Sequence, residues 1–379
     1  MRIVLYTHSL ISDWNHGNAH FLRGVLRELE ARGHDTLALE PEESWSRANL
    51  VADRGHAAIA AFAKVFPELT AAIYGPVFDH EAALAEADVV IVHEWTEPAL
   101  IARLGAMRRA GAGFTLIFHD THHRAVSARD DIAALALADY DLILAFGETL
   151  RQRYLAQGWA SQVHTWHEAA DLRLFFPRGP EEPRCDLIWI GNWGDGERAA
   201  ELDTFLIEPT RQLGLDGVVH GVRYPQDALA RLRLTRLRHG GSLANSDAPA
   251  AFARHRMTVH IPRAPYVSAL PGIPTIRVFE ALACGIPLIS APWHDCEGLF
   301  RDGDYLSVRD GAGMARAMQS LRHDAAAAAT LARGGLETIR ARHSCAHRVG
   351  ELLAILARQG AHRTRSALAR QTPSTLEPA

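Results

Sequence analysis

The chain has 379 residues, 48% of them hydrophobic, which is enough for two domains of ordinary size with a core in each. A formal net charge of −4 and an isoelectric point near 6.6 provide no basic field for nucleic acid. No apolar run approaches the roughly 18 residues that span a bilayer. Composition therefore argues against nucleic-acid binding and against a transmembrane segment, and it favours a small-molecule partner.

The four cysteines contain no C-x-x-C pair, and Thr7 and His8 interrupt the apolar start MRIVLYTHSLIS. These features predict a reducing, cytoplasmic environment. The basic residues are arginines apart from Lys64. Arginine must therefore supply most contacts to any anionic ligand.

Short β-rich runs alternate with longer amphipathic stretches in the first half of the chain, which is typical of parallel strands joined by crossover helices. A helix is predicted over 20–33, where apolar residues recur at helical spacing and the segment ends on Gly33. The predicted strands are 2–6, 34–40, 87–94, 114–119, 141–146 and 162–166.

Polar residues follow these strands. Ligands of open parallel sheets lie beyond the carboxyl ends of the strands. We therefore expect His8, the turn 16–18, Glu94 and the segment 119–123 to face one crevice.

The segment FFPRGPEEPRC, residues 175–185, contains three prolines and a cluster of charges that would interrupt regular structure. The alternation then restarts, with strands predicted at 186–193, 216–221, 257–263 and 286–293, and helices at 197–213, 275–285 and within 311–361. The predicted fold class is α/β, with two Rossmann-like, doubly wound domains and a cleft between them. The predicted boundaries are an acceptor-side domain 1–177, a nucleotide-sugar donor domain 178–344, a terminal helix 345–361 that packs back toward the first domain, and a disordered tail 362–379.

Two successive Rossmann-like domains form the GT-B architecture, and the stretch RVFEALACGIPLIS carries a more specific signal. It resembles the donor-site motif of retaining GT-B glycosyltransferases of the family-4 type. A carboxylate in a helix can accept hydrogen bonds from both ribose hydroxyls, so the resemblance makes Glu280 the predicted ribose ligand. Gly285 permits a tight reversal into the next strand, and Pro287 fixes its start. The alternative is a solvated helix carboxylate.

Other segments extend the resemblance over most of the chain. HEAADLRLFFP is similar to the interdomain segment of the family, with Asp171, Phe176 and Pro177 in place. HGNAHFLRGVLRELEARGH resembles the first loop and helix. His119 and Asp120, directly after a strand, resemble the His-Asp pair beside the reacting sugar.

Two departures indicate a narrower relative. Family-4 enzymes place a second Glu eight residues before the motif Glu, where this chain has Gly272, and the usual lysine is missing from IGNWGDGER. With Arg277 and the pattern HSCAHRVGELLAIL, these features are similar to the CgeB-like glycosyltransferases. Without a carboxylate at Gly272, backbone amides from Leu270 to Ile273 are the expected contacts to the sugar.

Binding of a diphosphate requires cations and N–H donors, because negative charge builds on the leaving phosphate. The candidate cations of the second domain are Arg198, Arg223, Arg263 and Arg277. The alternatives are a salt bridge to Glu280 for Arg277 and a solvated position for Arg198 and Arg223. Backbone groups at Gly191, Asn192, Ile273 and Thr275 complete the predicted donor site.

In the first domain, Gly17 and Asn18 can offer amide groups at the start of a helix. His16 is either a ligand contact or a loop histidine. The resemblance places His119 by the anomeric carbon and assigns Asp120 to holding it or reaching the acceptor. Glu94 is a further candidate on the acceptor side.

A zinc site could be assembled from His119, His122 and His123, or from His343 and His347, but neither set has a recognised four-ligand spacing. We predict a metal-independent glycosyltransferase without a cofactor that uses a UDP-, GDP- or dTDP-linked sugar, with a hexose as the expected cargo. The acceptor is open: a saccharide, lipid, protein or small molecule. The resemblance implies retention of anomeric configuration. The alternatives are a non-catalytic scaffold that binds a sugar nucleotide or a partner, and an epimerase.

Overall fold

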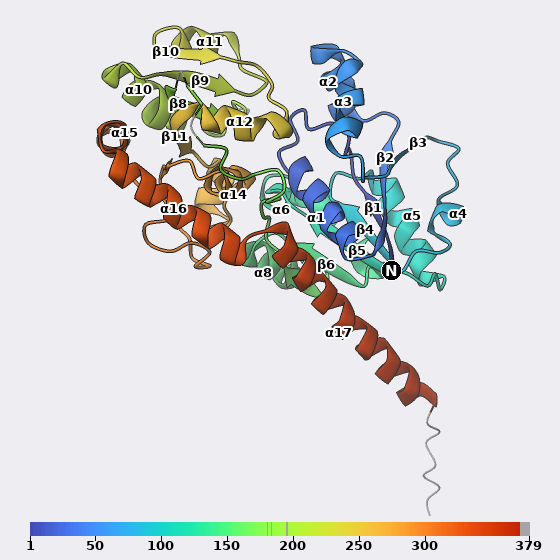
Figure 1. Cartoon of the computed structure of the whole chain (residues 1–379). Coiled ribbons are helices and arrows are strands. Elements are labelled where there is room, and N and C mark those ends of the chain that lie inside the picture. Colours follow the sequence, from blue (N-terminus) through green and yellow to red (C-terminus); the bar gives the residue numbers. More distant parts are fainter. Residues whose placement is uncertain (180, 183, 195, 372–379) are drawn as a thin grey trace, which may run out of the picture.

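The computed structural model describes residues 1–179, 181–182, 184–194 and 196–371, and all structural statements below refer to these residues. They form two parallel sheets, each covered by helices (Figure 1). No helix in this part of the chain is long and apolar enough to cross a membrane. The four cysteines are free thiols.

The first sheet has the strand order β3-β2-β1-β4-β5-β6-β7, and every neighbouring pair is parallel. Its strands are β1 (Arg2–Tyr6), β2 (Asp35–Pro41), β3 (Ala71–Tyr74), β4 (Val89–His93), β5 (Thr115–Asp120), β6 (Leu142–Ala145) and β7 (Val163–Thr165). The helical segments between them are α1 (Ala19–Ala31), α2 (Trp45–Arg54), α3 (Ala57–Val65), α4 (His80–Leu84), α5 (Pro98–Arg109), α6 (Arg124–Ser127), α7 (Arg129–Ala133), η1 (Leu137–Asp139) and α8 (Glu148–Ala156).

The second sheet has the order β10-β9-β8-β11-β12-β13 and is also parallel. Its strands are β8 (Cys185–Ile190), β9 (Asp216–His220), β10 (Arg236–His239), β11 (His255–His260), β12 (Leu288–Ser290) and β13 (Leu306–Ser307). The helical segments are α9 (Ala199–Leu202), η2 (Asp203–Ile207), α10 (Glu208–Leu213), α11 (Gln226–Leu232), η3 (Asn245–Asp247), α12 (Ala248–Ala253), α13 (Ala264–Ser268), α14 (Ile276–Ala283), α15 (Gly311–His323), α16 (Ala325–Arg342) and α17 (Cys345–Gln371).

The central strands form because their residues are apolar on both faces. All five residues of β4, VVIVH, are buried, as expected for a parallel strand between two helix layers. In both sheets the strand order reverses beside the first strand, between β1 and β4 and between β8 and β11. These switch points are where open α/β sheets bind ligands. The structure confirms the predicted α/β class with two doubly wound sheets.

Strands β3, β10 and β13 and the end of helix α17 are among the elements that differ from the sequence prediction. Strands β3 and β10 were not predicted, because β3 has four residues and no fully buried one, and β10 alternates Leu237 with charged or polar side chains. Helix α17 continues to Gln371 and so extends into the segment predicted to be disordered, whereas residues 372–379 lie outside the described residues.

Helices α1, α14 and α17 join the two halves of the molecule. One buried apolar cluster contains Leu26 of α1, Phe279 of α14 and Val349 of α17. The linker before β8 pairs with the residue that precedes α17, through a bridge between Ala170 and Ser344. Helix α17 packs along α1 and then projects past the first domain (Figure 1). The core therefore continues from one sheet to the other through these helices.

Candidate functional site

A cavity of about 510 Å3 lies between the two sheets, at the carboxyl ends of the strands beside both switch points. Its wall in the first domain includes His8, Asp13, Trp14, Asn15, His16, Gly17, Asn18, Trp45, Arg54, Trp95, Thr121 and His122. Its wall in the second domain includes Gly191, Asn192, Arg198, His220, Val222, Arg223, Ser242, Leu243, His260, Arg263, Tyr266, Thr275 and Arg277. The volume is within the range of small-molecule sites, about 300–1,000 Å3.

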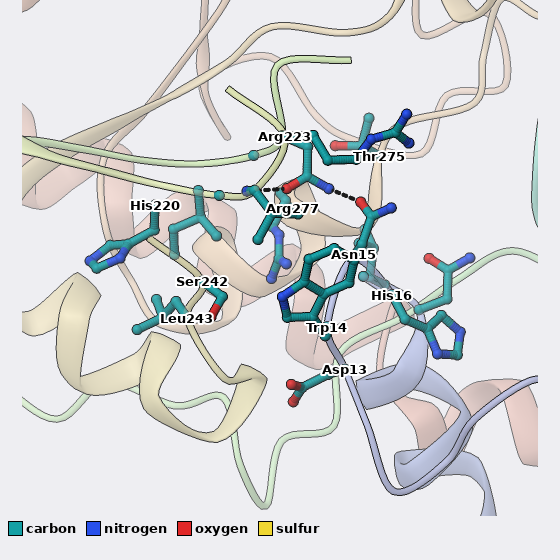
Figure 2. Close-up of a pocket in the computed structure, with 18 of the residues that line it drawn as sticks. Asp13, Trp14, Asn15, His16, His220, Arg223, Ser242, Leu243, Thr275 and Arg277 are labelled. Atoms are coloured by element: carbon teal, nitrogen blue, oxygen red, sulfur yellow. Dashed lines mark hydrogen bonds between the residues drawn. The ribbon is translucent and has the colours of Figure 1, made fainter. Parts of the chain in front are cut away.

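The loop that follows β1 crosses the cavity and contacts the second domain. The Asn192 amide group donates to Oδ1 of Asn15, and the backbone N–H of Val222 donates to Oδ1 of Asn192 at 2.8 Å (Figure 2). Asp13 accepts a hydrogen bond of 2.9 Å from the backbone N–H of Asn245. These contacts hold the domains in a closed arrangement around the cavity.

Two glycines, Gly191 after β8 and Gly221 after β9, allow the loops that follow these strands to touch through their backbones. A Cβ atom at Gly221 would lie 2.1 Å from the carbonyl oxygen of Gly191. A side chain at Gly191 would meet the ring of Trp189. The predicted donor residues Gly191 and Asn192 thus lie on the wall, where backbone groups can approach a ligand.

Four predicted or candidate cations, Arg198, Arg223, Arg263 and Arg277, line the second-domain wall. Arg198 donates to the carbonyl oxygens of Ile261 and Asn192 at 2.8 and 2.6 Å. Burial, followed by the charge of Arg263, lowers the pKa of Arg198 to about 10, so this guanidinium remains charged at neutral pH. The second-domain wall therefore carries a charged guanidinium at Arg198, in addition to Arg263, which pairs with Glu197, and Arg277.

The N-terminus of α14 opens into the same part of the cavity. Thr275 is its N-cap residue, and Thr275, Ile276 and Arg277 all line the wall. The first turn of a helix has N–H groups without intrahelical partners and a partial positive charge. Helix α14 and the guanidinium groups thus present donors and positive charge to one volume.

The structure does not place Glu280 on the cavity wall, which differs from the predicted ribose contact. Its side chain is 0% exposed, because Oε1 lies 2.7 Å from Nδ1 of His20 and Oε2 accepts a hydrogen bond from Arg277. Burial acts to raise the pKa of Glu280, but Arg277 and His20 lower it below its ordinary value. The alternative for Arg277, a salt bridge to Glu280, is therefore present in the structure. At this point of the cavity the wall is formed by Arg277 and not by Glu280.

The segment around Gly272 also differs from the prediction. Gly272 and Ile273 do not line the cavity, because Ile273 is fully buried and packs against Gly147 of the first domain. Two of the expected backbone donors are occupied, because the N–H of Gly272 donates to the carbonyl oxygen of His294 and that of Leu270 to the carbonyl oxygen of Pro265. These two amides are therefore not available to a sugar in this arrangement.

His16, Gly17 and Asn18 line the first-domain wall, as predicted. The amide group of Asn18 donates to Oγ1 of Thr121 at 2.8 Å, and a Cβ atom at Gly17 would lie 3.2 Å from Ile276. Gly17 therefore permits the close approach of this loop to the N-terminus of α14.

His119, which the resemblance places by the anomeric carbon, and Asp120 and Glu94, the candidates for the acceptor side, are buried beneath the cavity wall and do not line it. His119 is fully buried, with its ring centroid 4.9 Å from that of Trp166, and burial lowers its pKa to about 3. Asp120 accepts hydrogen bonds from the Tyr154 hydroxyl and from the backbone of the next turn. The following residues of the same strand end, Thr121 and His122, line the cavity instead.

Glu94 supports the same strand end. Its carboxyl accepts hydrogen bonds of 3.3 and 3.2 Å from the backbone N–H and hydroxyl of Thr121. Burial, followed by the charge of Asp120, raises the pKa of Glu94 well above its ordinary value. Glu94 therefore positions Thr121 from below.

Sequence reasoning missed an aromatic part of the first-domain wall. Trp45 and Trp95 line the cavity and are 39% and 40% exposed. His8 stacks against Trp45 with the ring centroids 5.4 Å apart, and Arg124 covers one face of Trp95. Single tryptophans in polar surroundings left no periodic pattern from which this surface could be predicted.

Sequence reasoning also missed Glu168. It belongs to the interdomain segment that was compared with known enzymes only through Asp171, Phe176 and Pro177. In the structure Glu168 lines the cavity and is 3% exposed. Among the described residues, no group of three or more His, Cys, Asp or Glu side chains is arranged to hold a metal ion.

Comparison with known proteins extends these observations. Residues 198–354 match a protein family described as glycosyl transferase-like. No sequence among curated proteins matches the chain significantly.

Similar folds occur among solved structures. Sucrose-phosphate synthase from Thermosynechococcus elongatus has a TM-score of 0.66 at 16% identity, covering 96% of this chain and 100% of its own. Anabaena HepE, in complex with UDP and glucose, has a TM-score of 0.65 at 14% sequence identity, and the match covers 94% of this chain and 99% of HepE. An alpha-glucosyltransferase in complex with UDP and a 13-mer DNA containing an HMU base has a TM-score of 0.69 at 13% sequence identity. This match covers 94% of the present chain and 99% of the alpha-glucosyltransferase. The chain therefore has the GT-B fold, and most of its second domain matches the glycosyl transferase-like family.

Proposed function

We propose that the protein is a glycosyltransferase that moves a sugar from a nucleotide diphosphate to an acceptor in the interdomain cavity. The observation that carries the proposal is the convergence of Arg198, Arg263, Arg277 and the N-terminus of α14 on one wall. Guanidinium groups bind phosphate oxygens in a bidentate manner, and a helix N-terminus favours anions. The matched family and the fold support the same function.

UDP is the proposed nucleotide, because UDP is bound in HepE and in the alpha-glucosyltransferase of the same fold. The diphosphate would lie between Arg277 and the loop that follows β8. The base would lie toward the carboxyl ends of β9 and β10, where Val222 and Leu243 line the cavity. A hexose is the proposed cargo, as HepE is also complexed with glucose.

In the proposed reaction the bond between the anomeric carbon and the terminal phosphate oxygen breaks, and both electrons go to that oxygen. Arg277 and the first turn of α14 stabilise the negative charge that develops there. The acceptor oxygen forms the new bond to the anomeric carbon and gives its proton to the leaving phosphate. Attack from the face of the leaving group retains the anomeric configuration, in keeping with the resemblance to family-4 enzymes.

Glu280 has an indirect part in this proposal. Its carboxylate accepts a hydrogen bond from Arg277 of its own helix and lies against His20 of the first domain. It therefore positions the guanidinium that binds the diphosphate, and it couples this position to domain closure. Glu94 and Asp120 support Thr121 and His122 in the same indirect way, by accepting hydrogen bonds from them.

The acceptor would bind on the first-domain side, between Trp45, Trp95 and His16. Indole rings provide apolar area with a polar edge, which suits a ring-shaped acceptor that carries hydroxyl groups. Within the glycosyltransferases we propose the CgeB-like group, and Gly272, the absent loop lysine and Arg277 support this assignment by resemblance.

A thermal-shift screen with UDP, GDP, dTDP and ADP tests the donor site. A ligand that binds only the folded state raises the melting temperature according to its concentration relative to Kd. We expect the largest shift with UDP. No shift with any of the four nucleotides at millimolar concentration would contradict the proposed function.

A further inference from the structure

Glu168 is an acidic side chain at the floor of the cavity, in the linker between β7 and β8. It is 3% exposed, yet it lines the same volume as Arg277 and Tyr266. Its carboxyl makes no hydrogen bond to any residue that the structure describes, and Oε1 is a buried atom without a partner. The floor thus contains a buried acid whose hydrogen-bonding capacity is unused.

The backbone around Glu168 is fixed by helix α17 and the turn before it. The Arg348 side chain donates to the carbonyl oxygen of Glu168 at 3.4 Å, and the indole N–H of Trp166 donates to the carbonyl oxygen of Arg348 at 2.8 Å. On the other side, the N–H of Ala170 donates to the carbonyl oxygen of His343 at 3.0 Å. The main chain on both sides of Glu168 is therefore tied to one scaffold, which fixes the point from which the side chain reaches the cavity.

A buried carboxyl without partners is costly. An unsatisfied buried polar group costs about 1–3 kcal/mol, and more if it is charged. Native structures therefore satisfy nearly all such groups, and an exception calls for a ligand or another explanation. Because this carboxyl borders a cavity of about 510 Å3, a ligand in the cavity can supply the missing partner.

The surroundings of Glu168 select a neutral ligand with hydroxyl groups. Burial, followed by the charge of Glu280, raises the pKa of Glu168 well above its ordinary value, and Arg277 opposes this only in part. An uncharged carboxylic acid donates one hydrogen bond and accepts others, as a sugar hydroxyl does. The phosphate groups already have Arg198, Arg263 and Arg277 on the wall.

We propose that Glu168 binds hydroxyl groups of the sugar that the nucleotide carries and so contributes to selection of that sugar. The inference rests on the proposed glycosyltransferase function and adds to it a sugar-binding residue. No carboxylate comes from position 272, and the backbone N–H groups of Leu270 and Gly272 already donate to other carbonyl oxygens. Asp13 also lines the cavity but pairs with Arg23, so Glu168 is the lining acid whose carboxyl is left for a ligand.

The test compares binding of UDP and of UDP-glucose to the wild type, Glu168→Ala and Glu168→Gln by calorimetry. We expect UDP to bind all three proteins with Kd values within about twofold. Glu168→Ala should bind UDP-glucose about tenfold more weakly than the wild type does, which corresponds to the loss of one hydrogen-bonded contact. Glu168→Gln should stay within about threefold, because an amide reproduces the shape and the donor of the uncharged acid.

A matched control is Glu181→Gln, which alters an exposed acid of the same linker that pairs with Arg254. If Glu168→Ala bound UDP and UDP-glucose more weakly than the wild type by the same factor, the assignment would be overturned, because Glu168 would then contact the nucleotide. Unchanged binding of both ligands would overturn it as well and leave a structural role. Binding of neither ligand by the wild type, which is the separate failure of the proposed function, would refute both proposals.

Discussion

Nδ1 of His20 in α1 lies 2.7 Å from Oε1 of Glu280 in α14, and both side chains are 0% exposed. The contact joins the first domain to the second beneath the cavity wall. The other oxygen of the same carboxylate accepts a hydrogen bond from Arg277, whose side chain lines the cavity. One acid thus contacts both a first-domain helix and a cationic residue of the cavity wall.

Replacement of Glu280 should destabilise the protein. Glu280→Ala leaves Arg277 and His20 without their buried partner, and breaking a buried pair costs about 3–5 kcal/mol. The free energy of unfolding, measured by urea denaturation, should fall by about 3 kcal/mol. Glu208→Ala is the control, because Glu208 is 57% exposed and pairs with Arg211 on the surface. An equal and small effect of both variants would contradict the importance of this contact.

The stabilisation by Glu280 should depend on pH. Its pKa in the folded protein is lowered below the ordinary value of 4.5, so the unfolded chain binds a proton first as the pH falls. The contribution of the Glu280 carboxylate to the free energy of unfolding is present above about pH 4.5, and it is lost as the pH falls through the pKa of Glu280 in the folded protein. The difference in unfolding free energy between the wild type and Glu280→Gln should therefore shrink on acidification below pH 4.5. A difference independent of pH would contradict this prediction, because it would show that the pKa of Glu280 is the same in the folded and unfolded chain.

Among the arginines of the wall, replacement of Arg277 should weaken nucleotide binding most. Arg277→Ala removes charge-assisted hydrogen bonds to the diphosphate, each worth about 1.5–3 kcal/mol, so Kd for UDP should rise at least tenfold. Calorimetric titration measures this change. Arg211→Ala, an exposed arginine in a surface pair with Glu208, should leave Kd within about twofold. Unchanged binding by Arg277→Ala would place the diphosphate elsewhere.

Much of this account could be predicted from the sequence, because the strands are short apolar runs with β-branched residues and the helices have amphipathic faces. The motif RVFEALACGIPLIS indicated α14, whose N-terminus does open into the cavity. The sequence could not show that Glu280 points away from the ligand space, since the direction depends on His20, distant in the sequence and brought near by packing of the domains.

The same limitation explains the other differences. His119 lies within β5 and Thr121 follows the strand, and the residue at which the strand ends decides which of them lines the cavity. Trp45, Trp95 and Glu168 come from a helix start, a loop and a linker that carry no local signal of function. Their proximity is a property of the two-domain arrangement and not of any single segment.

The tryptophan side of the cavity should affect the acceptor and not the donor. Trp45→Ala and Trp95→Ala each remove an indole that is about two-fifths exposed on the wall. Loss of such contacts costs about 0.5–1.5 kcal/mol, so KM for the acceptor should rise about twofold to tenfold while Kd for UDP stays unchanged. Leu234→Ala is the control, because Leu234 is 73% exposed and does not line the cavity. A rise in Kd for UDP would move the base or ribose to this side.

Turnover of a donor tests the central claim most directly. The protein is incubated with UDP-, GDP-, dTDP- and ADP-linked hexoses and a panel of saccharide, lipid, peptide and small-molecule acceptors, and release of nucleoside diphosphate is measured together with the glycosylated product. We predict stoichiometric release and product formation with a UDP-linked hexose, lost in Arg277→Ala although that variant remains folded. A wild-type protein that binds UDP but releases none from any donor across the panel would contradict the proposed function and indicate a binding scaffold.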